Sequence, residues 1–193
     1  MLERIKLTDL QSKVMTAEES AKFFEDGMTV GSSGFTRGGD TKVVLKAVAE
    51  RAKSENLKIT LVTGASLGHG TDAALVESGA LKKRLPFQVD TVMRKNINAG
   101  NVLFIDQHLG ETAEHILDGQ FKINLGVLEV AEILDDGSLV PTTSIGNNAE
   151  IAANADKLII EINTSIPTNI KGIHDIYSCL LYTSPSPRDR QKS

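Results

Sequence analysis

Apolar, β-branched segments alternate with small-residue loops and amphipathic segments along most of this sequence. Segments with the composition of buried strands lie at 27–31, 58–63, 102–106, 123–130 and 157–163. Segments with helical periodicity lie at 16–25, 41–53, 71–78, 108–117 and 147–155. Because strands that alternate with helices pair in parallel, the pattern predicts an α/β fold: an open, mostly parallel sheet with helices on both faces.

Two local signals add detail to this prediction. Thr16 precedes Glu19 by three residues, which is the spacing of a capping box at a helix start. Residues 134–140 are centred on Asp136 and Gly137, a dipeptide typical of a tight hairpin. No linker composition interrupts the chain before its last residues, so we expect a single domain over 1–178.

The last fifteen residues, 179–193, are expected to be a non-native tail. Residues 179–189 read CLLYTSPSPRD, which back-translates without a break into a transposase adapter used in sequencing libraries. A natural Ser/Pro-rich linker would explain Pro185 and Pro187 but not the unbroken codon match. We therefore set 179–193 aside as translated adapter sequence.

The charge and composition of the chain disfavour several classes of partner. The formal net charge is −4, or −6 without the tail, and no basic run is present, so neither nucleic acid nor a membrane surface is expected as a partner. The one cysteine, Cys179, lies in the tail, which leaves the natural part without a disulfide or a thiolate nucleophile. No stretch approaches the ~20 apolar residues of a membrane span, and we expect a cytoplasmic enzyme.

The glycine-rich loop at 31–39, with the sequence GSSGFTRGG, is the first candidate binding site. It follows a predicted strand and opens a predicted helix, an arrangement that presents backbone amides to anions. Its glycines match neither the dinucleotide fingerprint nor the phosphate-loop pattern. Two interpretations stay open: a loop that binds an anion, and a tight turn that needs glycine for its backbone angles.

A second small-residue loop, GASLG at 64–68, follows the next strand, so the two loops are expected to lie side by side and form a pocket. Ser66 is a candidate donor to a substrate carboxylate, although a serine in such a loop more often bonds its own backbone. The G-x-S-x-G spacing also raises a serine hydrolase as an alternative. Residues 68–70, which intervene before the next helix, disfavour it, because a nucleophile elbow enters its helix almost at once.

Two further segments carry candidate binding residues. Arg94 is either a clamp for a carboxylate or phosphate, or a salt-bridged surface residue. Gly146 and Asn147 end the run TSIGN at 143–147, which precedes a predicted helix.

A metal site can be imagined at His108, Glu111 and His115, which fall near one helix face. Their spacing matches neither H-E-x-x-H nor H-x-x-E-H, and the two histidines are two turns apart. A solvated or interface face is the favoured interpretation, and no metal site is predicted.

Taken together, these motifs resemble the acetyl-CoA hydrolase/transferase family, a branch of the class I CoA-transferases. The resemblance rests on GFT at 34–36, LVTGAS at 61–66, LPFQ at 85–88, MR at 93–94, NINAG at 96–100, DQHLG at 106–110, VPTTSIGN at 140–147 and GIHD at 172–175. It implies that residues 1–178 are an incomplete first domain of a two-domain α/β enzyme, which works as a homodimer when full length.

The resemblance also implies the chemistry. In the family, a glutamate of the second domain attacks an acyl-CoA thioester, and the intermediates that follow are an acyl-glutamyl anhydride and a glutamyl-CoA thioester. A small carboxylate such as acetate or succinate resolves the second intermediate, and water in its place would make the enzyme a hydrolase. That glutamate has no counterpart before Ser178, so we predict no catalytic residue in this chain and expect the fragment to be inactive and poorly soluble. The CoA thioester is a substrate, and no cofactor or metal is implied.

The residues of this chain that match the family's loops are expected to contact the substrate. They are Gly34, Phe35, Thr36, Ser66, Arg94, Gly146 and Asn147. Val89 stands where relatives have a threonine, which puts one carboxylate contact in doubt and is expected to alter acceptor choice. The alternative from another class is a non-catalytic nucleotide-binding α/β module that holds a phosphate on the 31–39 loop.

Overall fold

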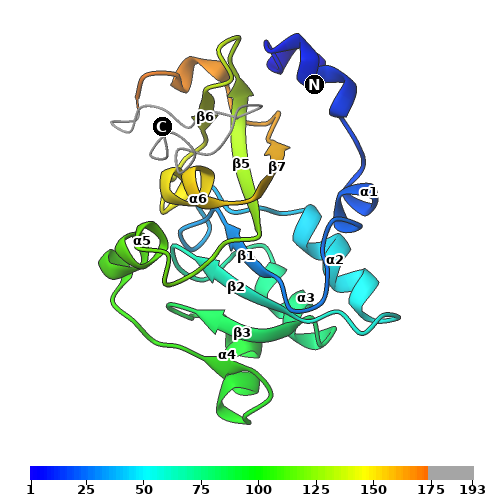
Figure 1. Cartoon of the computed structure of the whole chain (residues 1–193), viewed down its shortest axis with the longest axis vertical. Coiled ribbons are helices and arrows are strands. Elements are labelled where there is room, and N and C mark those ends of the chain that lie inside the picture. The colour runs from blue at the N-terminus through cyan, green and yellow to red at the C-terminus, as the bar shows by residue number, and fades with distance from the viewer. Residues whose placement is uncertain (174–193) are drawn as a thin grey trace, which may run out of the picture.

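The computed structural model describes residues 1–173, which form a seven-stranded sheet covered by helices (Figure 1). Its strand order is β4-β3-β2-β1-β5-β6, and β7 pairs with β5. The strands are β1 (Thr29–Ser32), β2 (Ile59–Thr63), β3 (Leu81–Leu85), β4 (Leu103–Phe104), β5 (Leu125–Ile133), β6 (Leu139–Pro141) and β7 (Lys157–Ile162). The tail expected at 179–193 and the last two residues of the 172–175 motif lie outside the described residues.

Helices cover both faces of the sheet, as the alternation of segments predicted. One apolar cluster joins the sheet to α1 (Ala17–Ala21), α2 (Val44–Ala52), α3 (Thr71–Glu77) and α4 (Thr91–Asn98). A second cluster, on the opposite face, includes α5 (Leu109–Leu117) and α6 (Asn148–Asn154). Short 3₁₀ turns span η1 (Leu2–Arg4), η2 (Thr8–Lys13) and η3 (Thr168–Ile170). Within residues 1–173, no helix is both long and apolar enough to cross a membrane.

The longest strand, β5, holds the sheet together. All nine of its residues are buried. Its first half pairs in parallel with β1 on one side and with β7 on the other, so that Leu125 is opposite both Val30 and Lys157. Its second half pairs antiparallel with β6, opposite Pro141 at Val130. The sheet is therefore parallel except for one hairpin.

Local sequence signals identified the ends of several elements correctly. The capping box forms at α1, where Thr16 and Glu19 exchange hydrogen bonds of 2.8 and 3.1 Å. The hairpin forms where Asp136 and Gly137 predicted it, and Gly137 has a φ of +82°. The first helix ends at Ala21, earlier than expected, because the chain turns there to bring Phe24 into the core.

Two elements escaped prediction, β3 and α4. The strand β3 reads LKKRL, and its three basic residues obscure the apolar pattern of a buried strand. Arg84 at its end is nevertheless fully buried. Only ion pairing with a residue distant in the sequence makes such burial possible.

The start of α2 is capped by a side chain from β7, a strand distant in the sequence. Glu161 on β7 accepts hydrogen bonds from the backbone amides of Lys42, Val43 and Val44, at 2.8 to 3.3 Å. These amides have no partner within the helix, and a carboxylate there also complements the helix dipole. Burial raises the pKa of Glu161, the three amide bonds oppose this, and the charge of Glu129 adds to the rise.

The raised pKa of Glu161 predicts a pH dependence of stability. A carboxyl group whose folded-state pKa is raised contributes most below its ordinary value of 4.5, and its contribution falls as the pH rises through the folded pKa. We expect the difference in unfolding free energy between the wild type and Glu161→Gln to decrease from pH 4 upward. Urea denaturation at a series of pH values measures it, and a difference independent of pH would contradict the prediction.

Candidate functional site

Three loops meet where β1, β2 and β6 end, and they pack through glycines. A Cβ placed on Gly64 would lie 3.0 Å from the carbonyl oxygen of Gly34 and 3.5 Å from the Cα of Gly146. A side chain at Gly64 would therefore push these backbones apart. The structure thus brings Gly34 and Gly146, predicted separately as binding residues, to one junction at the carboxyl edge of the parallel strands, the place where α/β sheets bind ligands.

Phe35 and Thr36 form the tip of the first loop. Phe35 and Gly38 exchange backbone hydrogen bonds of 2.9 and 3.1 Å, and Thr36 between them has a φ of +60°. The Thr36 hydroxyl donates to the carbonyl of Phe35 at 2.7 Å, and Thr36 also forms a β-bridge with Leu67 of the second loop. The first two loops are therefore neighbours, as predicted, and the Phe35 ring remains half exposed.

Ser66 lies buried between the second loop and the segment after β3. Its Oγ accepts a hydrogen bond from the backbone amide of Val89 at 3.3 Å, and only 1% of Ser66 is exposed. Within residues 1–173, no acceptor is found for the hydroxyl hydrogen, which leaves Ser66 able to donate. The helix α3 begins only at Thr71, so the loop is not a nucleophile elbow, and the serine-hydrolase alternative is disfavoured.

The other candidate residues lie in different settings. Asn147 follows the glycine junction, is 9% exposed, and its Nδ2 has no hydrogen-bond partner among residues 1–173. Arg94 is exposed on α4, and neither a hydrogen bond nor an ion pair ties its side chain to the described part of the chain. The structure therefore joins Asn147, but not Arg94, to the other candidates.

A buried ion pair between Arg84 and Asp72 supports the loops after β2 and β3. The Arg84 guanidinium donates to both Asp72 oxygens, at 3.0 and 3.3 Å, and both side chains are fully buried. It also donates to Thr63 Oγ1 at 2.9 Å, to the Ala65 carbonyl at 3.0 Å and to the Leu85 carbonyl. All these partners except Asp72 lie at strand ends or in the loops that carry the site.

Asp72 extends this support to two more backbone segments. It accepts from the amide of Leu67 at 2.6 Å and from the side chain of Gln88 at 2.9 Å. Sequence analysis missed both members of the pair. Their only signal is an arginine at the end of a strand and an aspartate in the first turn of a helix, and neither indicates burial.

The carboxylate of Asp40 connects the first loop to the second through hydrogen bonds. Its Oδ2 accepts from the amide of Gly68 at 3.1 Å and from Nδ1 of His69 at 2.9 Å. Lys42 lies 3.7 Å from the other Asp40 oxygen and also bonds Glu129, a buried residue of β5. The glycine-rich loop is thus fixed to the second loop and to the central strand.

The helix face considered for a metal ion has other contacts. His108 caps α5 by accepting from the amide of Gly110 at 3.1 Å. His115 packs edge-on against Phe121, with ring centroids 5.7 Å apart. In the described part of the chain, no three acidic, histidine or cysteine side chains are grouped closely enough to hold a metal ion.

The alternative interpretation, a nucleotide-binding module that holds a phosphate on the 31–39 loop, loses its main physical basis. It requires free amides where the glycine-rich loop enters α2. The carboxylate of Glu161 already occupies three of these amides, at Lys42, Val43 and Val44. A phosphate at this position would have to displace a buried carboxylate of the protein itself.

The buried ion pair predicts a large loss of stability on truncation. Arg84→Met leaves the Asp72 charge buried without its cationic partner, so we expect a loss of about 3–5 kcal/mol in unfolding free energy. Adding Asp72→Leu to Arg84→Met removes the uncompensated charge and should recover much of the loss. As a control, Lys53→Met breaks an exposed pair with Glu50 and should cost less than about 1 kcal/mol. Urea denaturation measures the unfolding free energy of all three variants. Equal losses for Arg84→Met and Lys53→Met would show that the Arg84–Asp72 pair does not stabilise the fold as a buried ion pair.

The tight glycine contacts predict a second, position-dependent effect. Gly39 and Gly100 both have positive φ, +62° and +77°, but a Cβ on Gly39 would lie 2.5 Å from the carbonyl oxygen of Ser144, whereas one on Gly100 meets nothing within 4 Å. We expect Gly100→Ala to cost about 1 kcal/mol from backbone strain. Gly39→Ala should cost about 3 kcal/mol or more because the clash adds to the strain. Thermal unfolding distinguishes them, and similar melting temperatures would argue against the close approach.

Comparison with known proteins identifies the family. The family model described as the acetyl-CoA hydrolase/transferase N-terminal domain matches residues 3–181. The chain is 39% identical to the succinyl-CoA:acetate CoA-transferase of Clostridium kluyveri over 91% of its own length and 33% of that relative. It is 34% identical to an acetyl-CoA hydrolase of Schizosaccharomyces pombe, over 90% of the chain and 35% of the relative. The chain therefore spans about a third of the length of these relatives.

Solved structures agree on the fold. RipA from Yersinia pestis superposes with a TM-score of 0.62 at 19% identity, over 86% of this chain and 38% of RipA. Glutaconate coenzyme A-transferase from Acidaminococcus fermentans gives a TM-score of 0.60 at 13% identity, over 77% of this chain and 68% of that one. With the family model covering nearly all of the described residues, the chain belongs to the acetyl-CoA hydrolase/transferase family of enzymes, whose N-terminal domain it matches.

Proposed function

We propose that the complete protein transfers coenzyme A between an acyl-CoA and a small carboxylate, such as succinyl-CoA and acetate, or hydrolyses acetyl-CoA. The observation that carries this proposal is the 39% identity to a succinyl-CoA:acetate CoA-transferase across 91% of the chain. The meeting of three loops at the carboxyl edge of the sheet supports it, because a carboxylate or acyl group needs such a site. In this proposal the chain supplies one wall of the pocket.

The covalent step is assigned to a glutamate in the part of the protein that this chain does not span. Its carboxylate attacks the thioester carbonyl and releases the CoA thiolate, leaving an acyl-glutamyl anhydride. The thiolate then attacks the glutamyl carbonyl and releases the acyl group as a carboxylate, leaving a glutamyl-CoA thioester. An incoming carboxylate reverses both steps and leaves as the new acyl-CoA, while water instead gives hydrolysis.

The buried glutamates of this chain are engaged in structural contacts, which supports a nucleophile elsewhere. Glu129 pairs with Lys42 and accepts from Thr142 at 2.8 Å. Glu161 is held by the amides at the start of α2. Glu132 pairs with Lys6 at 3.5 Å. A nucleophilic carboxylate has to be free to approach the thioester, and none of these three is.

Within the proposed wall, Ser66 is assigned to the substrate carboxylate. Its oxygen already accepts from Val89, so its hydroxyl hydrogen is available to a carboxylate oxygen. Asn147 adds a second donor through its Nδ2, which has no partner among residues 1–173. Gly34 and Gly146 allow the substrate to approach the backbone, and the exposed ring of Phe35 with Thr36 beside it forms an apolar rim. Arg94 has no such supporting contact in the described part of the chain and is the weakest member of the set.

Val89 is proposed to influence the choice of acceptor. Its side chain is half exposed beside Ser66, and it offers a methyl surface without a hydroxyl donor. Such a surface favours a short monocarboxylate over an acceptor that needs a further hydrogen bond at this position. We further propose that the complete protein is a cytoplasmic homodimer that requires no bound cofactor.

A chimera tests the proposed function directly. Residues 1–173 are joined to the portion of the C. kluyveri relative that lies beyond its match to this chain, and CoA transfer from succinyl-CoA to acetate is measured alongside acetyl-CoA hydrolysis. We expect transfer by the chimera and none by the 193-residue chain. A folded chimera without either activity, or turnover by the chain alone, would contradict the proposal.

The role of Ser66 is tested in the same chimera. Ser66→Ala removes one hydrogen bond to a charged group, worth about 1.5–3 kcal/mol, so we expect kcat/KM for the carboxylate acceptor to fall roughly 10- to 100-fold. Ser54→Ala, at an exposed serine that bonds only the carbonyl of Arg51, is the matched control and should leave the rates unchanged. Equal rates for the two variants would remove Ser66 from the binding site.

A further inference from the structure

Arg37, at the tip of the first loop, is a cation without a partner in the described part of the chain. Phe35 and Gly38 close this tip with two backbone hydrogen bonds, so Arg37 lies in a tight turn. Its side chain is exposed, and neither a hydrogen bond nor an ion pair ties its guanidinium to residues 1–173. A guanidinium in this state is able to hold a carboxylate through two parallel hydrogen bonds.

The second loop has a glycine where the stem of Arg37 passes. A Cβ on Gly68 would lie 2.6 Å from Cγ of Arg37 and 3.1 Å from its Cα. A side chain at Gly68 would therefore displace Arg37. The β-bridge between Thr36 and Leu67 holds the two backbones together at this point. The contact fixes the stem of Arg37 on the second loop, while the residue as a whole stays exposed.

Phe35 lies over the other end of the same loop. A Cβ on Gly64 would lie 3.7 Å from Cδ2 of the Phe35 ring. Ser66, assigned above to the substrate carboxylate, is midway between Gly64 and Gly68 in the chain, at most ~7 Å of backbone from either. An apolar ring and a cationic side chain therefore lie on either side of the same donor.

The carboxylate nearest to Arg37 in the sequence does not neutralise it. Asp40, just after the same loop, is fully buried, and its Oδ2 accepts from the amide of Gly68 and from His69. Lys46 adds another positive charge close by, because its Nζ donates to the carbonyl of His69 at 2.6 Å. The surface around Arg37 therefore attracts an anion.

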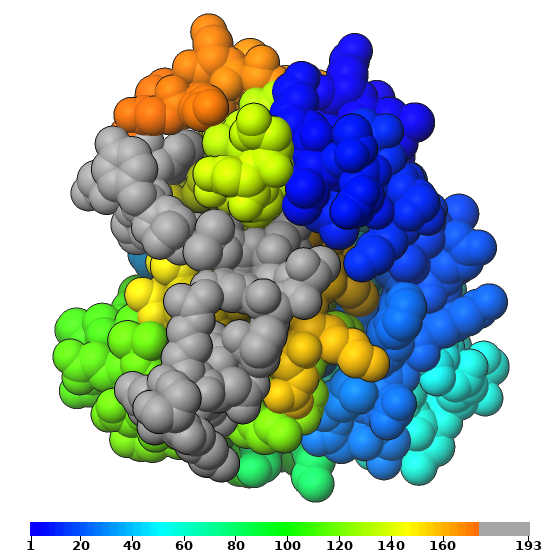
Figure 2. Space-filling model, turned by 45° about the horizontal axis from the view of Figure 1, so that its top comes forward, coloured from blue at the N-terminus to red at the C-terminus, as the bar shows by residue number. Residues whose placement is uncertain are grey.

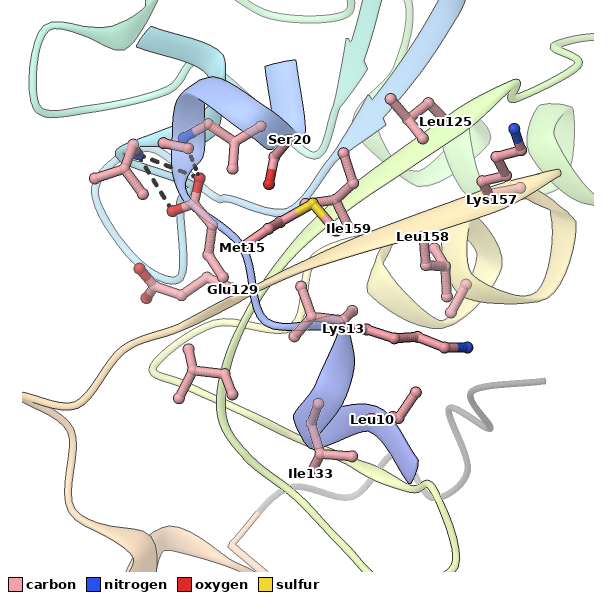
Figure 3. A pocket seen from close by; sticks show the side chains of 18 of the residues that line it. Leu10, Lys13, Met15, Ser20, Leu125, Glu129, Ile133, Lys157, Leu158 and Ile159 are labelled. Atoms are coloured by element: carbon pink, nitrogen blue, oxygen red, sulfur yellow. Dashed lines mark hydrogen bonds between the residues drawn. The ribbon is translucent and has the colours of Figure 1, made fainter. Parts of the chain in front are cut away.

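A separate groove of the described residues suits an anion less well. It has a volume of about 1660 Å³ and runs along β7 (Figure 3). One wall is the N-terminal segment, which lies beside the β5–β6 hairpin (Figure 2). Its lining is mainly apolar, it includes the carboxylates of Glu129 and Glu161, and it includes neither Arg37 nor Ser66. An anionic substrate is therefore expected at the loop junction and not in this groove.

We propose that Arg37 binds the distal carboxylate of a dicarboxylate acyl group, and so makes the site selective for the CoA thioester of a dicarboxylate such as succinate. Ser66 holds the reacting carboxylate, the methylenes lie beside Phe35, and the guanidinium pairs with the far carboxylate. The preference proposed for Val89 is unaffected, because a monocarboxylate acceptor needs only the donors at Ser66. The inference rests on the proposed function, since it concerns the same site.

The phosphates of coenzyme A are a less suitable ligand for Arg37. The thioester and the phosphates lie at opposite ends of the pantetheine arm of CoA. Arg37 lies beside the loop that holds the reacting carboxylate, which places it at the thioester end. The distal group of the acyl chain is therefore the anion within its reach.

Donor selectivity in the chimera tests this role. Succinyl-CoA and butyryl-CoA have acyl chains of equal length and differ in the distal carboxylate. With acetate as acceptor, we expect Arg37→Gln to lower kcat/KM for succinyl-CoA about 10- to 100-fold and to leave that for butyryl-CoA within about twofold. Arg37→Lys keeps the charge but not the two parallel hydrogen bonds, so it should recover part of the loss.

Lys58→Met is the matched control for the loss of a positive charge. Lys58 is exposed and precedes the first residue of β2, at the edge of the sheet opposite the loops. Its substitution should change kcat/KM for neither thioester. If Lys58→Met lowered the rate with succinyl-CoA as much as Arg37→Gln does, the effect would be one of net charge and the inference would be wrong.

Binding to the folded chimera gives a readout that needs no turnover. We expect succinate to shift the side-chain NMR signals of Arg37 and to bind about 10-fold or more tightly than butyrate. Arg37→Gln should abolish this preference. An inactive chimera that still binds succinate through Arg37 would refute the proposed function alone, whereas equal binding of succinate and butyrate would refute the inference.

Two kinetic results would also overturn the inference. An equal loss with succinyl-CoA and butyryl-CoA in Arg37→Gln would place Arg37 on the CoA portion or give it a structural role. Unchanged rates with both thioesters would assign the distal carboxylate to another residue. In either case CoA transfer by the unsubstituted chimera would leave the proposed function intact.

Discussion

The loops of the candidate site depend on a fully buried ion pair between Arg84 and Asp72. Arg84 reaches the end of β2 and the loop after it, while Asp72 holds the amide of Leu67 and the side chain of Gln88. Burying two charges costs several kcal/mol, and their attraction offsets this only when the remaining donors and acceptors are satisfied. Here the surrounding loop backbone satisfies them, so the pair and the loops can form only together.

The same principle explains the first loop. Asp40 and Glu129 are buried carboxylates stabilised by Lys42, by backbone amides and by Thr142. The rigid platform that results places three glycine backbones in contact. Such a platform suits the proposed role of this chain, because an enzyme that binds a carboxylate gains affinity when its donors are held in place before the substrate arrives. The platform holds the donors, and the reactive carboxylate is proposed to come from elsewhere.

Much of the fold followed from local patterns. The α/β class, the parallel sheet, the capping box at Thr16 and the Asp136-Gly137 hairpin were predicted correctly, as was the adjacency of the first two loops. The strand β3 and the helix α4 were missed because Lys82, Lys83 and Arg84 obscure the apolar periodicity on which strand prediction depends. Of the candidate site residues, Gly34, Phe35, Thr36, Ser66, Gly146 and Asn147 lie at or beside the loop junction, while Arg94 lies apart on α4.

The sequence by itself determined most of the segments that become strands and helices, and the turn of the hairpin, because periodicity, capping and turn chemistry act over a few residues. It also carried the family motifs. Only the tertiary structure decided that Glu161 caps α2 and that Arg84 is buried against Asp72. These contacts join residues that are distant in the chain, and they arise from the balance between burying a charge and finding its partners, which no local pattern encodes.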